Sequence, residues 1–194
     1  MYEFKDLTRL TALASALVGI YAGSDILAAG LESLLGLPPE DSLGIVGLLA
    51  IVNFLIVVAC FVVVGRWIYV ASNNAHALSS EMTISPGWAV GWYFIPFANL
   101  IKPFHAMREI WWASHDSEGG YEERAPQLIG WWWGLWITTN ILENVSWRFG
   151  ELGVGPVVSL LAAVLNVALC IILIRLMSAV GASQRYARHA LAFA

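Results

Sequence analysis

The chain has 194 residues, a formal net charge of -4, 59% hydrophobic residues and only 12% charged residues. A soluble domain carries about 25% charged residues, so this composition excludes an ordinary soluble protein and predicts an integral membrane protein. Its ten Lys and Arg residues are dispersed and are outnumbered by fourteen acidic residues, which excludes the basic surface that a nucleic-acid partner requires.

Two long apolar runs open the chain. The first predicts a helix over 10–34, which Gly36, Pro38 and Pro39 end, because glycine caps a helix and proline cannot continue it. The second run has no charged residue between Leu43 and Gly65 and continues as a helix to about residue 78. Both runs are long enough to cross a bilayer.

A proline-broken segment follows over about 85–114, where Pro86, Pro96 and Pro103 interrupt an apolar stretch. If all five apolar stretches of the chain cross with the N-terminus inside, four basic residues lie inside and six outside, against the positive-inside rule. If this segment instead enters and leaves on one side, nine lie inside and only Arg148 lies outside. We therefore predict a re-entrant or interfacial segment.

The remaining apolar stretches predict helices over about 126–147 and 154–180. The predicted fold is an all-α integral membrane protein with four transmembrane helices plus the proline-broken re-entrant or interfacial segment. Four crossings of about 20 residues use nearly half of the chain, so residues 1–194 are expected to form a single membrane domain. The charge count places both termini in the cytoplasm.

The broken segment also carries a long, specific motif. It reads SPGWAVGWYFIPFANL over 85–100, with RWIY before it at 66–69 and MREIW after it at 107–111. Over roughly residues 50–175 the chain resembles a bacterial multi-pass membrane family known only as domain of unknown function 4328. The resemblance implies the bacterial inner membrane and no particular activity, ligand or cofactor.

Aromatic side chains and a few polar groups define the predicted binding residues. In the helix over 126–147, two tryptophans, an amide and a carboxylate share one face, and an acid inside a membrane marks a candidate functional site. Glu143 lies close to the end of this helix, so simple contact with water is the alternative explanation for it. The predicted ligand-binding side chains are Trp88, Trp92, Phe94, Phe97, Asn99, Trp133, Trp136, Asn140 and Glu143.

Two functions fit these residues. The first is a non-catalytic protein that binds a lipid, a small apolar ligand or a partner subunit between its helices. The alternative is an ion or small-solute channel or transporter with the re-entrant segment as its constriction, where Pro96, Asn99 and Lys102 would line a wet path. An enzyme is disfavoured, because the sequence has no recognisable nucleophile constellation.

His105 and Glu109 share a helix face and are the candidate metal ligands, although an ordinary solvated charged face also explains them. No cofactor is specified by the sequence, and the four histidines lie near the ends of the apolar stretches rather than where a haem would need them.

Besides the lipid bilayer, the sequence predicts contacts between helices. Ser15, Gly19 and Gly23 follow one another at four-residue spacing and predict a close-packing face, either within the chain or towards a second copy or a membrane partner. Asn53 and Asn166 are expected to hydrogen-bond to neighbouring helices.

Overall fold

The computed structural model describes residues 2–35, 44–115, 124–149 and 155–192. These residues form helices and no strand, which confirms the predicted all-α class. The elements are α1 (Thr8–Leu35), α2 (Ile45–Leu78), α3 (Pro86–Gly91), the short 3-10 helices η2 (Trp92–Phe94) and η3 (Ala98–Leu100), α4 (Lys102–His115), α5 (Arg124–Phe149) and α6 (Gly155–Ala192).

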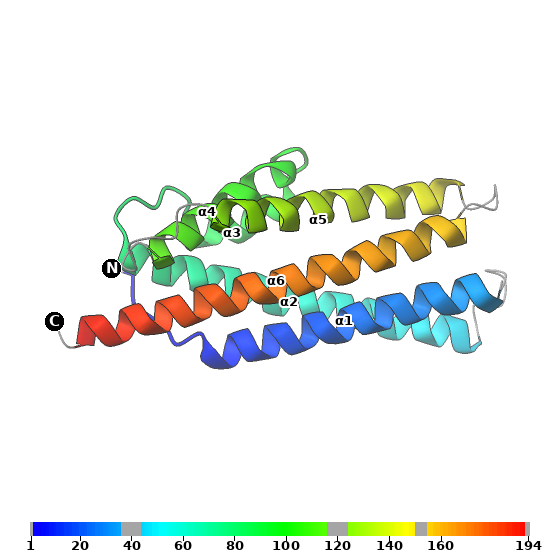
Figure 1. Ribbon diagram of the computed structural model, residues 1–194, viewed down its shortest axis with the longest axis horizontal. Coiled ribbons are helices and arrows are strands. Elements are labelled where there is room, and N and C mark those ends of the chain that lie inside the picture. The colour runs from blue at the N-terminus through cyan, green and yellow to red at the C-terminus, as the bar shows by residue number, and fades with distance from the viewer. Residues whose placement is uncertain (1, 36–43, 116–123, 150–154, 193–194) are drawn as a thin grey trace.

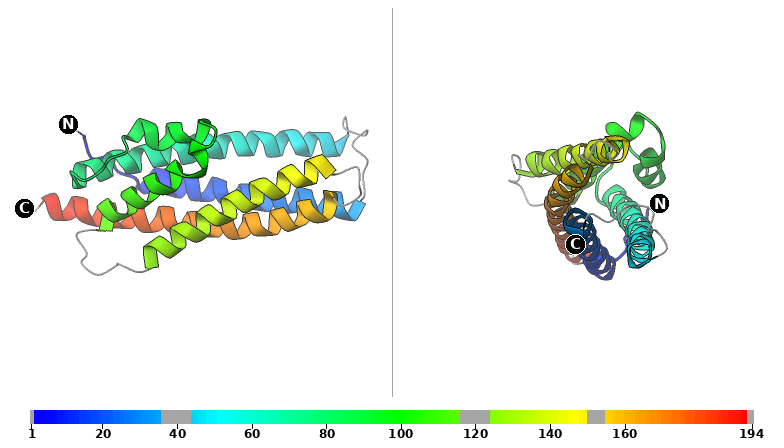
Figure 2. Two further views of the ribbon diagram at one scale, coloured as in Figure 1. Left: turned by 90° about the horizontal axis from the view of Figure 1, so that it is seen from above. Right: turned by 90° about the vertical axis from the view of Figure 1, so that its right-hand side faces the viewer.

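The four long helices run antiparallel to their sequence neighbours, and both termini lie at the same end of the bundle (Figure 1). Seen end-on, α2, α1, α6 and α5 form an open arc in that order (Figure 2). Adjacent helices of the arc pack closely, whereas α2 and α5 at its two ends make hardly any contact. The arc therefore leaves a gap between α2 and α5.

The segment from α3 to α4 is a hairpin that starts and ends on the side of the termini and packs against that half of the arc (Figure 2). Its α4 contributes Met107 and Ile110 to the core, where they are fully buried together with Trp67 of α2 and Leu176 and Met177 of α6. The densest packing of the molecule is thus in the half that carries the termini.

The other half exposes a broad apolar surface. On α2 alone, Leu48, Ile51, Phe54, Leu55 and Val62 are exposed. Soluble monomers rarely expose contiguous apolar surface on this scale. Of the described helices, three are long and apolar enough to cross a membrane, over Thr8–Leu31, Gly47–Leu78 and Gly155–Arg188. Helix α5 is not among them, because amides, a carboxylate and weakly hydropathic tryptophans interrupt its apolar residues.

The two predicted asparagines do bond between helices. Asn53 of α2 accepts a hydrogen bond from the Ser24 hydroxyl of α1 at 2.8 Å, and the Asn166 amide of α6 donates to the Asp25 carboxylate of α1 at 2.7 Å. Such bonds satisfy polar groups that would be costly to leave unpaired in an apolar setting.

Two expectations differ from the structure. Helix α6 extends to Ala192, beyond the predicted end near residue 180, because Ser183, Gln184 and Ala187 continue its buried face. Within the chain, α1 packs through Ala14, Val18, Ala22 and Ala29, whereas a Cβ added at Gly19 or Gly23 would meet nothing within 4 Å. Gly19 and Gly23 therefore lie away from the helix contacts of α1 within this chain, whereas the Ser15 hydroxyl oxygen is buried. The predicted helix stop at Gly36, Pro38 and Pro39 lies outside the described residues.

Candidate functional site

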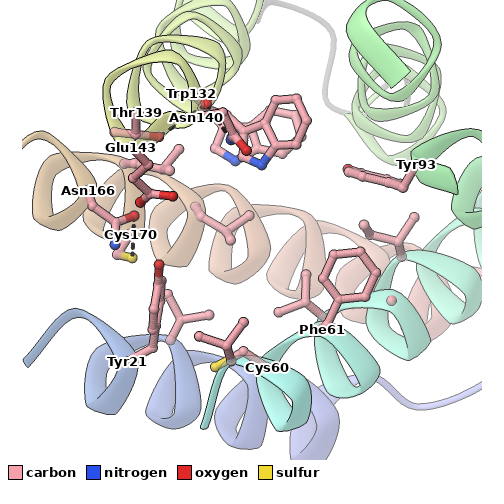
Figure 3. Close-up of a pocket in the computed structure, with 18 of the residues that line it drawn as sticks. Tyr21, Cys60, Phe61, Tyr93, Trp132, Thr139, Asn140, Glu143, Asn166 and Cys170 are labelled. Carbon is pink, nitrogen blue, oxygen red and sulfur yellow. Dashed lines mark hydrogen bonds between the residues drawn. The ribbon is translucent and has the colours of Figure 1, made fainter. Parts of the chain in front are cut away.

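The gap between α2 and α5 contains a cavity of about 330 Å³, bounded behind by α1 and α6 and at one end by the α3–α4 hairpin (Figure 3). This volume is at the lower end of the range for small-molecule sites, about 300–1,000 Å³. Helices α2 and α5 make hardly any contact, and the lining residues Phe61, Asn140 and Glu143 on these two helices are exposed, so the cavity is open between them.

Most of the cavity wall is apolar. All four long helices and the hairpin contribute aliphatic or aromatic side chains, which are Val18, Val57, Phe61, Val64, Ile68, Val90, Trp132, Trp136, Leu169 and Leu173. The thiols of Cys60 and Cys170 also lie in the wall, and neither forms a disulfide. Such a surface gains free energy by covering an apolar ligand, at roughly 25 cal/mol per Å² removed from water.

The other end of the cavity is polar (Figure 3). Asn140 donates to the Trp136 carbonyl at 2.7 Å, and the Thr139 hydroxyl donates to the same carbonyl at 3.1 Å, so both groups are satisfied within α5. Glu143, one turn further along α5, receives no hydrogen bond from any described residue. No Lys or Arg of the described chain lines the cavity.

Opposite Glu143, α1 and α6 bring a second polar group. The Asp25 carboxylate accepts from Asn166, and Tyr21 of α1, one turn from Asp25, points its hydroxyl towards Asn166 and Cys170 (Figure 3). The polar end of the cavity thus offers carboxylate and hydroxyl groups and no positive charge. Chemically it is suited to a group that donates hydrogen bonds or carries a positive charge.

Tyr93 of the hairpin closes the opposite end. Its ring meets Phe61, Trp133 and Trp136 edge to face, with centroids 6.4, 6.4 and 6.5 Å away. Edge-to-face aromatic contacts at this separation are favourable beyond the area they bury. The Trp133 indole N–H donates to the Leu100 carbonyl at 2.8 Å and so fixes the hairpin against α5.

Of the predicted ligand-binding side chains, Trp136, Asn140 and Glu143 line the cavity. Trp133 lies beside it and holds the hairpin, as described. The hairpin residues Trp88, Trp92, Phe94, Phe97 and Asn99 do not line the cavity. Trp88, Phe94 and Phe97 face outwards and are 51, 69 and 84% exposed. The reason is the tight turn through η2, which directs Tyr93 inwards and its neighbour Phe94 outwards.

The predicted metal ligands, His105 and Glu109, lie on α4 and do not line the cavity. Both oxygens of Glu109 are occupied: backbone N–H groups of Thr83 and Ile84 donate to it at 3.0 Å, and the Thr83 hydroxyl donates as well. Glu109 therefore organises the turn that leads into α3, while His105 is exposed nearby. The described residues contain no group of three or more His, Cys, Asp or Glu side chains placed to hold a metal ion.

Sequence reasoning missed the cavity residues Tyr21, Cys60, Phe61, Tyr93 and Trp132. One signal was available for Tyr21, because it precedes Asp25 by four residues and so shares its helix face. The other four residues have no such sequence signal, because an aromatic or small side chain in an apolar run can equally well face lipid, the protein core or a cavity.

The described residues form an all-helical fold with an apolar cavity, and three of their helices are long and apolar enough to cross a membrane, so the fold is that of a helical membrane-type protein. The family described as Domain of unknown function (DUF4328) matches residues 40–182, and the chain belongs to this family. The match confirms the resemblance found in the motif around residues 85–111. No curated protein and no solved structure matches the chain.

Proposed function

We propose that this chain is a bacterial inner-membrane protein in which α1, α2, α5 and α6 cross the bilayer, and that it binds a lipid or small apolar ligand in the cavity between α2 and α5. The observation that carries the proposal is the cavity itself, which has an apolar wall, one polar end and a lateral opening. In a bilayer this opening would face the acyl chains.

Several features support a fourth crossing by α5. It packs along α6, and its 26 residues correspond to about 39 Å of helix, longer than the roughly 30 Å hydrocarbon core. An even number of crossings agrees with the termini lying at one end (Figure 1). The nine-to-one distribution of basic residues favours the cytoplasm for that end.

The position of the hairpin supports an interfacial location. Val90 packs against Gly65, where its Cγ1 lies 3.6 Å from the place a Cβ would take, and Tyr93 meets Phe61. The apolar part of α2 ends at Arg66, and Phe61 precedes it by more than one helical turn, so these contacts favour a hairpin tip that dips about one turn into the apolar layer. Lys102 directly after the tip lies over the Trp92 ring at 5.6 Å, a pairing suited to the headgroup region.

The cavity lining narrows the ligand class. An apolar tail would lie along the wall between Trp136 and Val64, and a hydroxyl or amine at its end would meet Glu143. An anionic head is disfavoured at that end, because Glu143 and Asp25 would repel it and no described cation lines the cavity.

A substitution that fills the cavity tests the proposal. Val64 on α2 lines the cavity, whereas Val62 on the same helix is 65% exposed and lies outside it. We expect Val64→Trp to retain at least one phosphatidylcholine molecule fewer than the native protein in native mass spectrometry after delipidation. Val62→Trp should retain as many as the native chain.

Equal lipid retention by V64W and the native protein would contradict binding in this cavity. The alternative function, an ion conduit, is tested by measuring ion flux through the native protein and through Asn99→Leu in proteoliposomes. Ion flux that is present in the native protein and disappears in Asn99→Leu would favour a conduit through the hairpin. The binding proposal predicts no ion flux through the native protein or through Asn99→Leu.

A further inference from the structure

A second cavity, of about 410 Å³, lies at the end of the molecule that carries the termini. The N-terminal segment before α1 forms one side of it, and residues 181–188 of α6 form the other. Both segments belong to the end of the molecule that carries the termini (Figure 1). It shares no lining residue with the cavity between α2 and α5.

Buried hydrogen bonds fix the walls of this second cavity. Asn74 of α2 is fully buried, accepts from the Lys5 backbone N–H and donates to the Lys5 carbonyl, both at 2.8 Å. The same amide donates to Gln184 of α6 at 2.9 Å, and Gln184 donates to the Ala71 carbonyl at 3.0 Å and to the Ser114 hydroxyl at 2.9 Å. The N-terminal segment is therefore held in a defined position against α2 and α6.

The charges on these walls are mostly positive. Lys5, Arg185 and Arg188 line the cavity, and Asp6 is the only acidic residue in its described lining. No ion pair joins Asp6 to either arginine. Instead, Asp6 accepts from the Thr8 backbone N–H at 2.8 Å, which keeps the pKa of its carboxyl below the usual range, and the charges of Arg188 and Arg185 add to this effect. Three cations thus face one carboxylate that is already hydrogen-bonded.

The two arginines are spaced for joint recognition. Residues three apart lie on the same face of a helix, so Arg185 and Arg188 can reach one group together. The planar guanidinium donates paired hydrogen bonds that match the oxygens of a phosphate, whereas the Lys5 ammonium adds a compact charge.

We propose that this cavity is a binding site for an anionic phosphate group, held by Arg185 and Arg188 with Lys5 from the N-terminal segment. Asn74 is two helical turns beyond Arg66, where the apolar part of α2 ends, so the site lies about 12 Å past that point. Both the headgroup of an anionic lipid and a soluble phosphate compound have access to this level.

Two probes separate these sources. The first is native mass spectrometry of the full chain with dioleoylphosphatidylglycerol against dioleoylphosphatidylcholine, and the second is the shift of thermal unfolding produced by inorganic pyrophosphate in phosphatidylcholine nanodiscs. We expect the double variant Arg185→Gln and Arg188→Gln to lose about tenfold in affinity for whichever probe binds. Phosphatidylglycerol binding assigns a lipid headgroup, and a pyrophosphate shift assigns a soluble ligand.

The matched control is Arg9→Gln with Lys102→Gln, which removes two exposed charges on the same side of the molecule but outside this cavity. It should change either affinity less than twofold. An equal loss in both double variants, or no binding of either probe to the native chain, would overturn the site. If the arginine variant does not fold, Lys5→Gln alters a single exposed side chain and must itself weaken binding measurably.

Discussion

The Thr11 hydroxyl of α1 lies where α1, α2 and α6 meet, close to the end of the apolar run of α2. The Trp67 indole N–H donates to the Thr11 hydroxyl at 2.9 Å. A Cβ added at Gly181 would lie 3.0 Å from the same oxygen. Glycine at position 181 therefore lets α6 approach α1 closely while Thr11 keeps its bond to α2. The hydrogen bond from Trp67 to Thr11 therefore depends on the absence of a side chain at position 181.

Gly181→Ala should lower the free energy of unfolding by up to about 2 kcal/mol. The added methyl displaces Thr11 and weakens its bond to Trp67, at a cost of about 1–3 kcal/mol, and the better helix propensity of alanine offsets up to about 1 kcal/mol of this. Thermal unfolding followed by circular dichroism in detergent measures the change. Gly19→Ala is the control, since nothing lies within 4 Å of its added Cβ. The control should be neutral or up to about 1 kcal/mol more stable, from helix propensity alone. If G181A unfolds at the native temperature, Thr11 has room to move aside.

Residue-level chemistry was only partly accessible from the sequence. The face that groups Trp136, Asn140 and Glu143 follows from helical spacing alone, and these three side chains do line one cavity. Whether they bind a ligand is still a prediction. The direction of Tyr93 and Phe94 could not be foreseen, because it depends on where α3 gives way to the 3-10 turn of η2.

Among the elements, the α3–α4 hairpin departs most from regular helix. Phe97 at its tip has a φ of 64°, a left-handed conformation that costs a bulky residue about 1–3 kcal/mol. Yet the backbone there is well satisfied: Ala98 donates to Pro96 at 2.8 Å, Asn99 to Ile95 at 3.0 Å and Leu100 to Phe97 at 3.2 Å. A satisfied backbone and an exposed ring are what a segment dipping into lipid requires.

A spin label on Phe97→Cys tests this location in liposomes, in a background where Cys60 and Cys170 are replaced by alanine. We expect oxygen, which concentrates in lipid, to relax the label more than a water-soluble nickel chelate does. The matched position is Glu81, exposed in the turn before α3, where the nickel chelate should dominate. Dominance of the nickel chelate at position 97 would place the hairpin tip in water.

For the molecule as a whole, the arrangement of apolar runs was predictable and the packing between them was not. Charge-free runs and prolines are local features, so they located the helices and the break before α4. The open arc could not be predicted, because no pattern in the sequence indicates which helices lack contact with each other. The extension of α6 was missed for a related reason: its buried face beyond Arg175 alternates with charges that resemble a cytoplasmic tail.

Whole-molecule topology is tested by labelling single cysteines in intact cells with an impermeant maleimide. A cysteine at Glu40, between α1 and α2, or at Gly150, between α5 and α6, should react, whereas one at Ser117, between α4 and α5, should be spared. The reason is the concentration of basic residues on the side of the termini. All three positions lie outside the described residues. Reaction at Ser117 in sealed cells would contradict both the cytoplasmic termini and the interfacial hairpin.

The order of helices in the arc has a consequence for biosynthesis. Helices α1 and α6 are neighbours at the centre of the arc, yet α1 is synthesised before the other described helices and α6 after them. Until α6 is inserted, Asp25 lacks its Asn166 donor and Asn74 lacks Gln184. With the proposed four crossings, a nascent chain stopped after α5 would hold the Asp25 carboxylate in the bilayer without its Asn166 donor. We expect such a chain to be a substrate for membrane quality-control proteases, because α6 supplies the donor that stabilises α1.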